Sequence, residues 1–534
     1  MAIRKSRLGK TPIGKQLNEL FAIAKESNRL DAERKTNDPT ESIEELLSRR
    51  QALKLAGVGA ATALSGGALA SAAKYFDHDG AVNKDVRVAI IGGGIAGLNA
   101  CYHLGRHGVK AQIYEAQQRT GGRIMTRYNV VGDGLVTEVG ASFIDSVHTE
   151  MLRLAKTFDI GMWDTMAKSE AKLQPAYFFG GKMRWNKEVI AAMKPFCARI
   201  ADEAKNAHVL NHQHFNLRGK QLDQLSTKEY IQKIGMEGWL FDFMNVAYMT
   251  EDGTEIDTLS AVQFVGDIGT NTSGAFDLFT GSDQRYHTKG GNSLIPEALA
   301  RRVKSQINLG MWLEKISMDS AGAYKLTFKT DGGTKVVTAD YVIMTMPFKI
   351  LREIEVDIEM PPLKTQAIKE LNYGDNCKLI LGFSSRFWRK LGTNGLFFTD
   401  LPIQSGWDSG WMQKPEHSSL TIFFGGKSAI EQASIPIDER IQKALPELEK
   451  MYPGATQEFN GKRTQFNWPH YPFAKASYSS YGVGQQTTFG GVEQQTVGRM
   501  YFAGEHCDDQ DQGFMNGGAQ TGLDAAKALL KAIR

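Results

Sequence analysis

The feature that most constrains this chain is the stretch VAIIGGGIAG at residues 88–97, in which an apolar run leads into closely spaced glycines. Such a run is typical of a buried parallel strand, and Gly92, Gly94 and Gly97 fit the spacing G-x-G-x-x-G at the start of a helix. The first glycine permits a tight turn, the second lets a pyrophosphate approach the backbone, and the third lets helix and strand pack closely. The spacing therefore predicts a strand–turn–helix unit whose helix N-terminus faces a phosphate group.

The next strand-like run favours a dinucleotide over a lone phosphate. AQIYE ends in Glu115, about 20 residues after the glycines, where a carboxylate can accept hydrogen bonds from the hydroxyls of an adenosine ribose. The two runs together predict a Rossmann-type domain.

Charge and cysteine usage exclude several classes of protein. The formal net charge of the 534 residues is +4, and this excess lies in the first 70 residues, which hold 12 Lys or Arg and 8 Asp or Glu. The remainder has 51 residues of each sign and gives no electrostatic footprint for nucleic acid. The four cysteines are scattered and show neither CxxC nor Cys/His spacing. We therefore expect no metal site, no disulfide framework and no nucleic-acid partner.

The sequence before the glycine-rich turn looks like a leader. SRRQALKLAGVGAATALSGGALASAA, residues 48–73, has Arg49-Arg50 and then a weakly apolar stretch that ends in small residues. It resembles a twin-arginine export signal, so residues 1–72 are expected to engage the twin-arginine export machinery and to direct the protein to the bacterial periplasm or out of the cell. The alternative is an ordinary helix with a basic N-terminus. The glycines of the apolar stretch argue against a membrane span.

Four further stretches carry a family resemblance that spans about residues 86–534. They are the GGR of residues 121–123, TEVGASF at 137–143, HTKGGNSLIPEAL at 287–299 and MYFAGEHCDDQDQGFMNGGAQTG at 500–522. In this order and spacing they resemble FAD-dependent oxidoreductases of the amine oxidase superfamily, and most of all the monoamine and polyamine oxidases.

The resemblance implies FAD as the cofactor and assigns residues to it. Ser477 stands where monoamine oxidases carry the cysteine that bonds the flavin, so the FAD is expected to be non-covalent. The residues assigned to the cofactor site are Gly92, Gly94, Gly97, Glu115, Gly122, Arg123, Gly140, Ala141, Ile316, Glu505 and Met515.

The resemblance also implies a reaction centre. Lys378, on the strand before Phe387-Trp388, takes the place of the lysine that holds a water against flavin N5, while Tyr478 and Phe514 take the places of two aromatic walls. The implied reaction is hydride transfer from the carbon beside an amine nitrogen to flavin N5. The imine product would be hydrolysed to an aldehyde and an amine or ammonia, with O₂ reduced to H₂O₂ or another acceptor taking the electrons.

Two positions bear on the substrate. Phe143 lies where L-amino-acid oxidases often carry an arginine for the carboxylate, which favours a primary amine, diamine or polyamine. Asp145 is positioned to hold a distal ammonium, or alternatively it caps a helix. The other readings of the function are an L-amino-acid oxidase, a desaturating enzyme, and a flavoprotein scaffold or electron-transfer protein.

The expected fold class is α/β. A Rossmann-type, glutathione-reductase-like FAD domain would be assembled from residues 84–150, 275–350 and 480–534. An α+β substrate domain with a mixed sheet would take residues 151–274 and 351–479, and a homodimer is possible.

Overall fold

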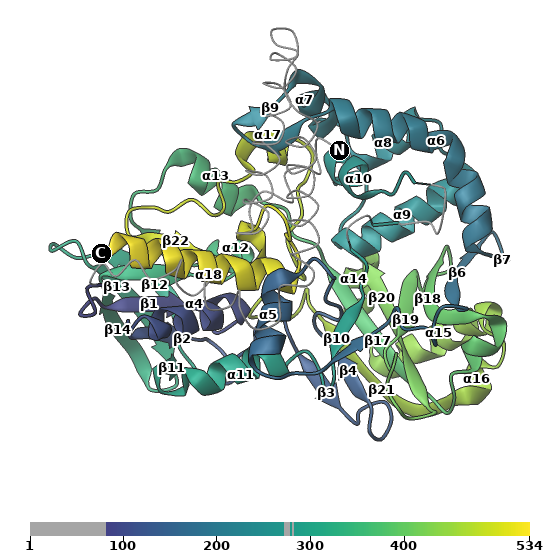
Figure 1. Cartoon of the computed structure of the whole chain (residues 1–534), viewed down its shortest axis with the longest axis horizontal. Helices are drawn as coiled ribbons and strands as arrows, with labels where there is room; N and C mark the ends of the chain where they lie inside the picture. Colours follow the sequence, from purple (N-terminus) through teal and green to yellow (C-terminus); the bar gives the residue numbers. More distant parts are fainter. Residues whose placement is uncertain (1–81, 272–277, 280–281) are drawn as a thin grey trace, which may run out of the picture. The chain divides into compact units, whose positions relative to one another are not determined.

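The computed structural model describes residues 82–271, 278–279 and 282–534, so the leader predicted at residues 1–72 lies outside the described residues. Lys84–Ala532 belong to one compact unit, which is drawn in colour in Figure 1. Among the helices that the structure describes, none is both long enough and apolar enough to span a bilayer.

A parallel sheet forms the first layer of this unit. All four pairs of neighbouring strands run parallel. In spatial order the strands are β11 (Ile307–Asn308), β2 (Ala111–Tyr114), β1 (Val88–Ile91), β15 (Tyr341–Met344) and β22 (Met500–Phe502). Every residue of β1 is buried, as expected for a central strand with both faces covered. The order brings together three segments that lie far apart in the chain.

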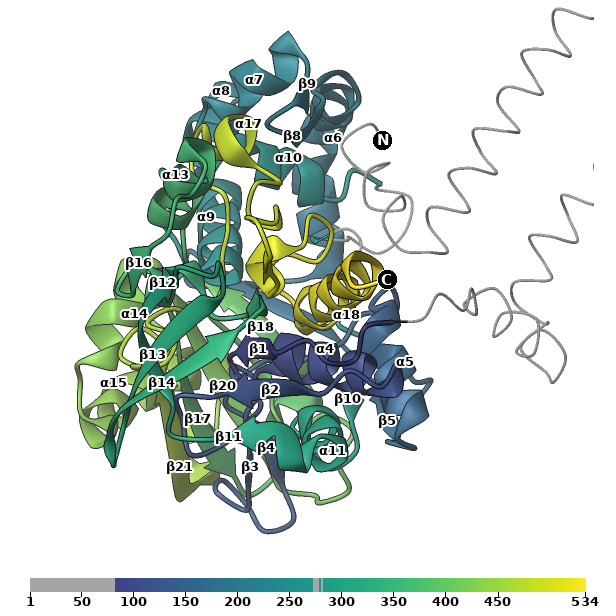
Figure 2. The same cartoon turned by 90° about the vertical axis from the view of Figure 1, so that its left-hand side faces the viewer.

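Helices cover one face of this sheet and a second sheet covers the other. On the helical face, α4 (Ile95–Arg106) lies alongside α18 (Met515–Ala532), as Figures 1 and 2 both show. A Cβ added at Gly522 of α18 would lie 2.2 Å from the carbonyl oxygen of Ala96, so the two helices meet backbone to backbone.

The second sheet is antiparallel except at one edge. Its strands, in spatial order, are β14 (Gly333–Ala339), β13 (Tyr324–Thr330), β12 (Trp312–Met318) and β16 (Glu355–Asp357). Ala89 and Ile91 of β1 share one apolar core with Leu326 and Phe328 of β13. This shared core packs the parallel sheet against the second sheet.

A seven-stranded mixed sheet forms the other half of the unit. Its strands, in spatial order, are β21 (Phe459–Asn467), β17 (Asn376–Phe383), β20 (Ser418–Gly425), β19 (Ser405–Asp408), β18 (Thr393–Thr399), β6 (Gln174–Phe179) and β7 (Lys182–Arg184). Only β18 and β6 pair in parallel. All eight residues of β17 are buried, which places any polar side chain on this strand inside the protein.

Helices pack on this mixed sheet. One group shares a core with Tyr177 and Phe179 of β6. It consists of α6 (Asn186–Asn206), α7 (Leu217–Asp223), α8 (Thr227–Lys233), α9 (Gly238–Asp252) and α10 (Ala261–Asp267). The other helices are α5 (Thr149–Thr157), α11 (Leu294–Arg302), α12 (Phe348–Leu351), α13 (Pro362–Glu370), α14 (Gly426–Ala433), α15 (Ile437–Met451), α16 (Ala455–Glu458) and α17 (Gln485–Phe489).

Short strand pairs and single turns of 3₁₀ helix complete the unit. The pairs are β3 (Thr126–Tyr128) with β4 (Val136–Glu138), β5 (Met162–Asp164) with β10 (Tyr286–Thr288), and β8 (Val209–Asn211) with β9 (His214–Phe215). The 3₁₀ turns are η1 (Lys304–Gln306), η2 (Phe387–Leu391) and η3 (Glu505–Cys507).

The predicted fold class is confirmed. A parallel Rossmann-type sheet stands beside a mixed sheet with helices. The strands of the parallel sheet come from each of the three segments assigned to the FAD domain. The exact domain limits stay predictions.

Candidate active site

The two glycine-rich turns lie against each other at the start of α4. Gly121 donates its N–H to the carbonyl oxygen of Gly93 at 2.9 Å. A Cβ added at Gly122 would lie 3.2 Å from the Cα of Gly94, and one at Gly97 would lie 2.1 Å from the carbonyl oxygen of Gly92. Side chains are therefore excluded from this backbone surface, which suits a pyrophosphate at a helix N-terminus.

Glu115 is held in place by the glycine turn itself. One carboxylate oxygen accepts the N–H of Gly93 at 2.6 Å, and the other accepts the N–H of Gln117 at 2.8 Å. Burial raises the pKa of this carboxyl, while the two backbone donors lower it. A carboxylate has about four acceptor positions, so lone pairs remain for ribose hydroxyls.

Ile316 does not lie with the other predicted cofactor residues. Its side chain is completely buried in the middle of β12, inside the core under the parallel sheet. The residue of this segment that reaches Glu115 is Met311, whose N–H donates to the carbonyl oxygen of Glu115 at 2.8 Å. We therefore correct the assignment of Ile316: the part of this segment that reaches Glu115, the predicted ribose-binding residue, is the backbone of Met311.

An ion pair joins the GGR turn to the C-terminal segment. Arg123 donates to Glu505 at 2.7 Å and to the carbonyl oxygen of Ser477 at 2.9 Å. Glu505 also accepts from the Ser479 hydroxyl at 2.7 Å and from the N–H of Gly513 at 3.0 Å. Burial by itself would raise the pKa of Glu505, but the charge of Arg123 and these hydrogen bonds outweigh it and hold the pKa below its usual value. Glu505 thus ties together segments that carry both predicted aromatic walls.

Lys378 is buried on β17 and surrounded by acceptors. Its Nζ donates to the carbonyl oxygens of Gly140 at 2.6 Å and Glu138 at 3.2 Å, and to the Ser142 hydroxyl at 2.9 Å. Burial lowers its pKa to about 7, while Glu138 raises it. The structure therefore brings Lys378 to the turn that holds the predicted cofactor residues Gly140 and Ala141, and a Cβ at Gly140 would lie 2.1 Å from the carbonyl oxygen of Arg123.

The two predicted aromatic walls lie on either side of Gly513. A Cβ at Gly513 would lie 3.5 Å from the Tyr478 ring, and Phe514 is the next residue, directly before Met515 at the start of α18. The Tyr478 hydroxyl donates to the carbonyl oxygen of Glu251 at 2.5 Å. The Phe514 ring packs against His148, with the ring centroids 5.0 Å apart. Neither Glu251 nor His148 was predicted, because nothing in their local sequence marks them.

The two predicted substrate residues occupy different surroundings. The Phe143 ring lies 5.9 Å from Trp407 and 6.5 Å from Trp411, in an aromatic cluster. Asp145 is 2% exposed and accepts the N–H of Gln284 at 2.7 Å. The cap residue of α5 is His148, so the alternative that Asp145 caps this helix is wrong.

Carboxylates gather beside the Tyr478 wall. Burial, together with the negative charges of Asp145 and Asp267, raises the pKa of Glu251 to about 7. Burial, together with the negative charges of Asp267 and Glu251, raises the pKa of Asp252 well above its usual value. Glu251 thus lies within electrostatic reach of both Asp145 and Asp252, and Asp145 also lies 3.3 Å from His148 Nε2.

Known proteins are similar in sequence to most of this chain. The family model described as "Flavin containing amine oxidoreductase" matches residues 95–530. A flavin-containing amine oxidase of Danio rerio is 26% identical over 470 residues, which cover 84% of this chain and 86% of the relative. An L-amino-acid oxidase of Vipera ammodytes ammodytes is 24% identical over 479 residues, covering 83% and 93%.

A solved structure shares the fold. Wild-type putrescine oxidase bound to putrescine superposes with a TM-score of 0.71 at 19% sequence identity and covers 84% of this chain and 99% of its own. The family match extends from α4, the helix that follows the glycine-rich turn, into α18. The chain therefore belongs to the flavin-containing amine oxidoreductases, and it is an FAD-dependent oxidoreductase that acts on amines.

Proposed function

We propose that this enzyme oxidises a primary amine, diamine or polyamine, and that a substrate with a second ammonium group is preferred. The balanced reaction is amine plus O₂ plus water, giving an aldehyde, ammonia or a smaller amine, and H₂O₂. The observation that carries the proposal is the group of carboxylates beside Tyr478.

The protein's own residues account for binding and orientation. FAD, when bound, supplies the chemistry by accepting the hydride from the carbon next to the amine nitrogen. Gly92, Gly94 and Gly122 would hold its pyrophosphate and Glu115 its ribose. Tyr478 and Phe514 would flank the neutral amine nitrogen and exclude water.

Lys378 has a separate task. By the family resemblance its Nζ would hold a water, and to do so it must release one of its three acceptors on the Glu138–Ser142 segment. Because its pKa lies near 7, a neutral fraction of this amine is present at neutral pH and can accept a proton from that water.

The carboxylates explain the preference for a second ammonium group. Glu251 is repelled by Asp145 and in turn repels Asp252, and burial makes the charged forms of all three carboxyl groups unfavourable. An aliphatic ammonium has a pKa near 10 and stays charged while the reacting amine is neutral. A distal ammonium among these carboxylates would relieve the repulsion and form charge-assisted hydrogen bonds.

An L-amino-acid oxidase is the second candidate, because relatives such as the Vipera enzyme carry that name. This activity needs a cation for the substrate carboxylate. Arg123, a predicted cofactor residue, is already paired with Glu505. Phe143 supplies an aromatic ring where such a cation is expected.

The test is anaerobic bleaching of the flavin by matched compounds. Butylamine, 1,4-diaminobutane, spermidine and L-leucine are compared under single-turnover conditions. We expect the diamine or spermidine to bind about 10- to 100-fold more tightly than butylamine, the gain expected from a charged hydrogen bond. If L-leucine bleached the flavin and no amine did, the enzyme would instead be an L-amino-acid oxidase.

A matched pair of variants tests whether Glu251 causes the preference for diamines over monoamines. Glu251→Gln should reduce the diamine advantage over butylamine, whereas Asp257→Asn, at an exposed residue following the same helix, should leave it unchanged. Since the pKa of Glu251 is raised to about 7, the wild-type advantage should increase from pH 6 to pH 8 as the carboxylate ionises. An advantage that is the same at both pH values would contradict the role of Glu251.

We propose further that residues 1–72 direct export by the twin-arginine route. The support is Arg49-Arg50 followed by the weakly apolar stretch. Replacing both arginines by lysine should retain the FAD-loaded protein in the cytoplasm of a bacterial host, as measured by fractionation and peroxide release. Unchanged export of that variant would show that the pair is not a signal.

A further inference from the structure

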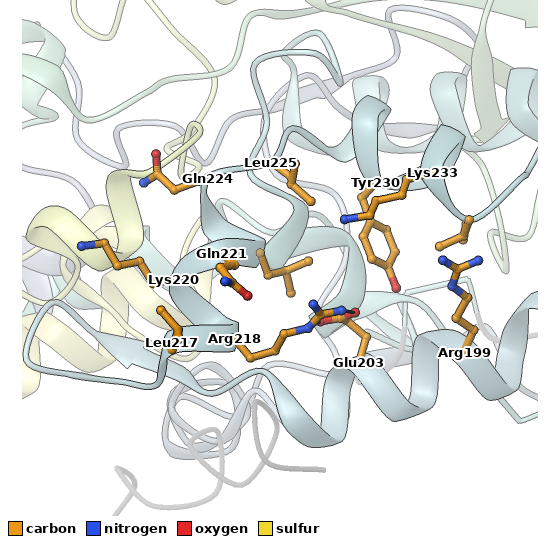
Figure 3. Close-up of a pocket in the computed structure, with 12 residues that line it drawn as sticks. Arg199, Glu203, Leu217, Arg218, Lys220, Gln221, Gln224, Leu225, Tyr230 and Lys233 are labelled. Atoms are coloured by element: carbon orange, nitrogen blue, oxygen red, sulfur yellow. Dashed lines mark hydrogen bonds and ion pairs between the residues drawn. The ribbon is translucent and has the colours of Figure 1, made fainter.

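A cavity lies among the helices α6, α7 and α8, outside the predicted active site. It has a volume of about 640 Å³, within the range that holds small organic ligands, and Figure 3 shows the side chains that line it. Its apolar lining includes Leu222, Leu225 and Ile234. None of its lining residues belongs to the predicted FAD or amine site.

Four of the other lining residues are basic and exposed. Arg199, Arg218, Lys220 and Lys233 border the cavity, and Glu203 is the acidic residue among them. Glu203 is already bound by Arg218 through two hydrogen bonds of 2.6 and 2.5 Å. No described residue forms an ion pair with the other three cations. The cavity therefore carries positive charge that is not balanced within the described part of the chain.

A buried hydroxyl without a partner marks one end of this cavity. Tyr230 is 3% exposed, and its hydroxyl has no hydrogen-bond partner among the described residues. In Figure 3 the hydroxyl points toward the gap between Arg199 and the pair formed by Arg218 and Glu203. A buried hydroxyl without a partner costs free energy, so a ligand oxygen placed there would restore a hydrogen bond.

We propose that this cavity binds a small organic anion with an apolar chain. Its acidic group would lie between Arg199 and Tyr230, and its chain would lie along Leu222 and Leu225. Lys233 adds positive charge at the same cavity. The inference does not depend on the amine specificity proposed above.

Hexyl phosphate is the probe, measured by isothermal titration calorimetry on the FAD-loaded enzyme. We expect it to bind at least about tenfold more tightly than inorganic phosphate, because the chain buries apolar surface. Equal affinity of the two compounds would overturn the proposed apolar subsite. A change in the flavin spectrum, or competition with the amine, would place the probe in the active site and likewise overturn the proposal.

Variants test the charged end of the cavity. Arg199→Gln combined with Lys233→Gln should weaken hexyl phosphate about tenfold or more. Lys335→Gln, at an exposed lysine on β14, is the matched control and should have no effect. Equal binding to wild type and to the Arg199/Lys233 variant would contradict the proposal.

Tyr230→Phe separates ligand binding from a structural role. The ring is retained and an unpartnered hydroxyl is removed, so the melting temperature without ligand should not fall. The affinity for hexyl phosphate should nevertheless fall about three- to tenfold. Unchanged affinity would show that the hydroxyl does not face the ligand.

A second experiment distinguishes a soluble anion from an anionic lipid in a membrane. Vesicles of phosphatidylglycerol are sedimented with the wild-type enzyme and with the Arg199/Lys233 variant. A soluble anion predicts hexyl phosphate binding without cosedimentation. Cosedimentation that the variant abolishes, without binding of hexyl phosphate, would overturn the proposal in favour of a membrane surface.

Discussion

Lys378 illustrates how surroundings decide the chemistry of one side chain. It lies on a strand whose residues are all buried, and its Nζ lies 5.1 Å from the centre of the Trp407 ring. The carbonyl and hydroxyl oxygens around it stabilise the charged form, while burial opposes that form. Because the second effect is larger, the pKa falls to about 7.

Lys378→Met should lower the rate of turnover about 100-fold, the usual effect of losing a group that transfers protons. Lys378→Arg should not restore it, because a guanidinium remains charged at neutral pH. Stopped-flow measurement of flavin reduction and reoxidation identifies the affected step. Lys390→Met, at a nearby exposed lysine, is the control, and equal losses in both variants would argue against a specific role.

Ser477 leads to a prediction about the cofactor bond. Its hydroxyl donates to the carbonyl oxygen of Gly374 at 2.8 Å and also lies 2.5 Å from Asn376 Oδ1, and it offers no thiol for a flavin link. Denaturation with trichloroacetic acid should therefore release all of the yellow FAD into the supernatant, as measured by its absorbance. Flavin that remains with the precipitate would contradict non-covalent binding.

The sequence predicts those site residues whose role depends on local backbone. The glycines are recognisable because their spacing alone defines the turn. Ile316 was misassigned because the segment reaches Glu115 through the backbone of Met311, and a backbone contact leaves no mark on residue type. His148 and Glu251 were missed for a related reason: each meets its partner across hundreds of residues, in Phe514 and Tyr478.

At the scale of elements, the pair α4 and α18 determines the geometry of the site. One helix starts at the glycine-rich turn and the other directly after Phe514, so their contact sets the separation between the predicted pyrophosphate and amine sites. Gly522 permits this contact because a Cβ there would meet Ala96.

Gly522→Ala should destabilise the protein by about 1–3 kcal/mol, the usual cost of overpacking. Thermal unfolding of the FAD-loaded enzyme measures this change. Gly105→Ala, in α4 with open space around its Cα, is the matched control and should be neutral or stabilising by about 0.5–1 kcal/mol. A smaller loss at Gly522 than at Gly105 would show that the helices can separate freely.

Long apolar runs predict where strands lie in the sequence. They do not predict the order in which the strands pair within a sheet. The strand expected before Phe387-Trp388 is β17, and the apolar run at Tyr341–Met344 forms β15. The order of seven strands in the mixed sheet depends on long-range pairing that no local pattern encodes. The resemblance to amine oxidases implied a mixed sheet in this domain but no order of its strands.

At the scale of the whole molecule, FAD should contribute to stability as well as to chemistry. Its predicted contacts come from the segments around Gly94, Glu115, Arg123 and Glu505, so binding holds them together. Ligand at about 1,000 times its dissociation constant adds about 4 kcal/mol to folding.

Removal of FAD should therefore lower the melting temperature by several degrees, which differential scanning fluorimetry measures. Added FAD should restore it, whereas riboflavin should not, since it lacks the pyrophosphate for the glycine turns. Restoration by riboflavin alone would show that those turns do not bind the cofactor.

The position of Glu505 late in the chain has a consequence for biosynthesis. The ribosome makes the glycine-rich turn early, but β22, Glu505 and α18 come last, and β22 completes one edge of the parallel sheet. Cofactor loading must then wait until the segment that carries Glu505 and α18 has emerged from the ribosome. Tight flavin retention would thus report that translation has passed α18, so chains truncated before this helix could be distinguished by their lack of colour.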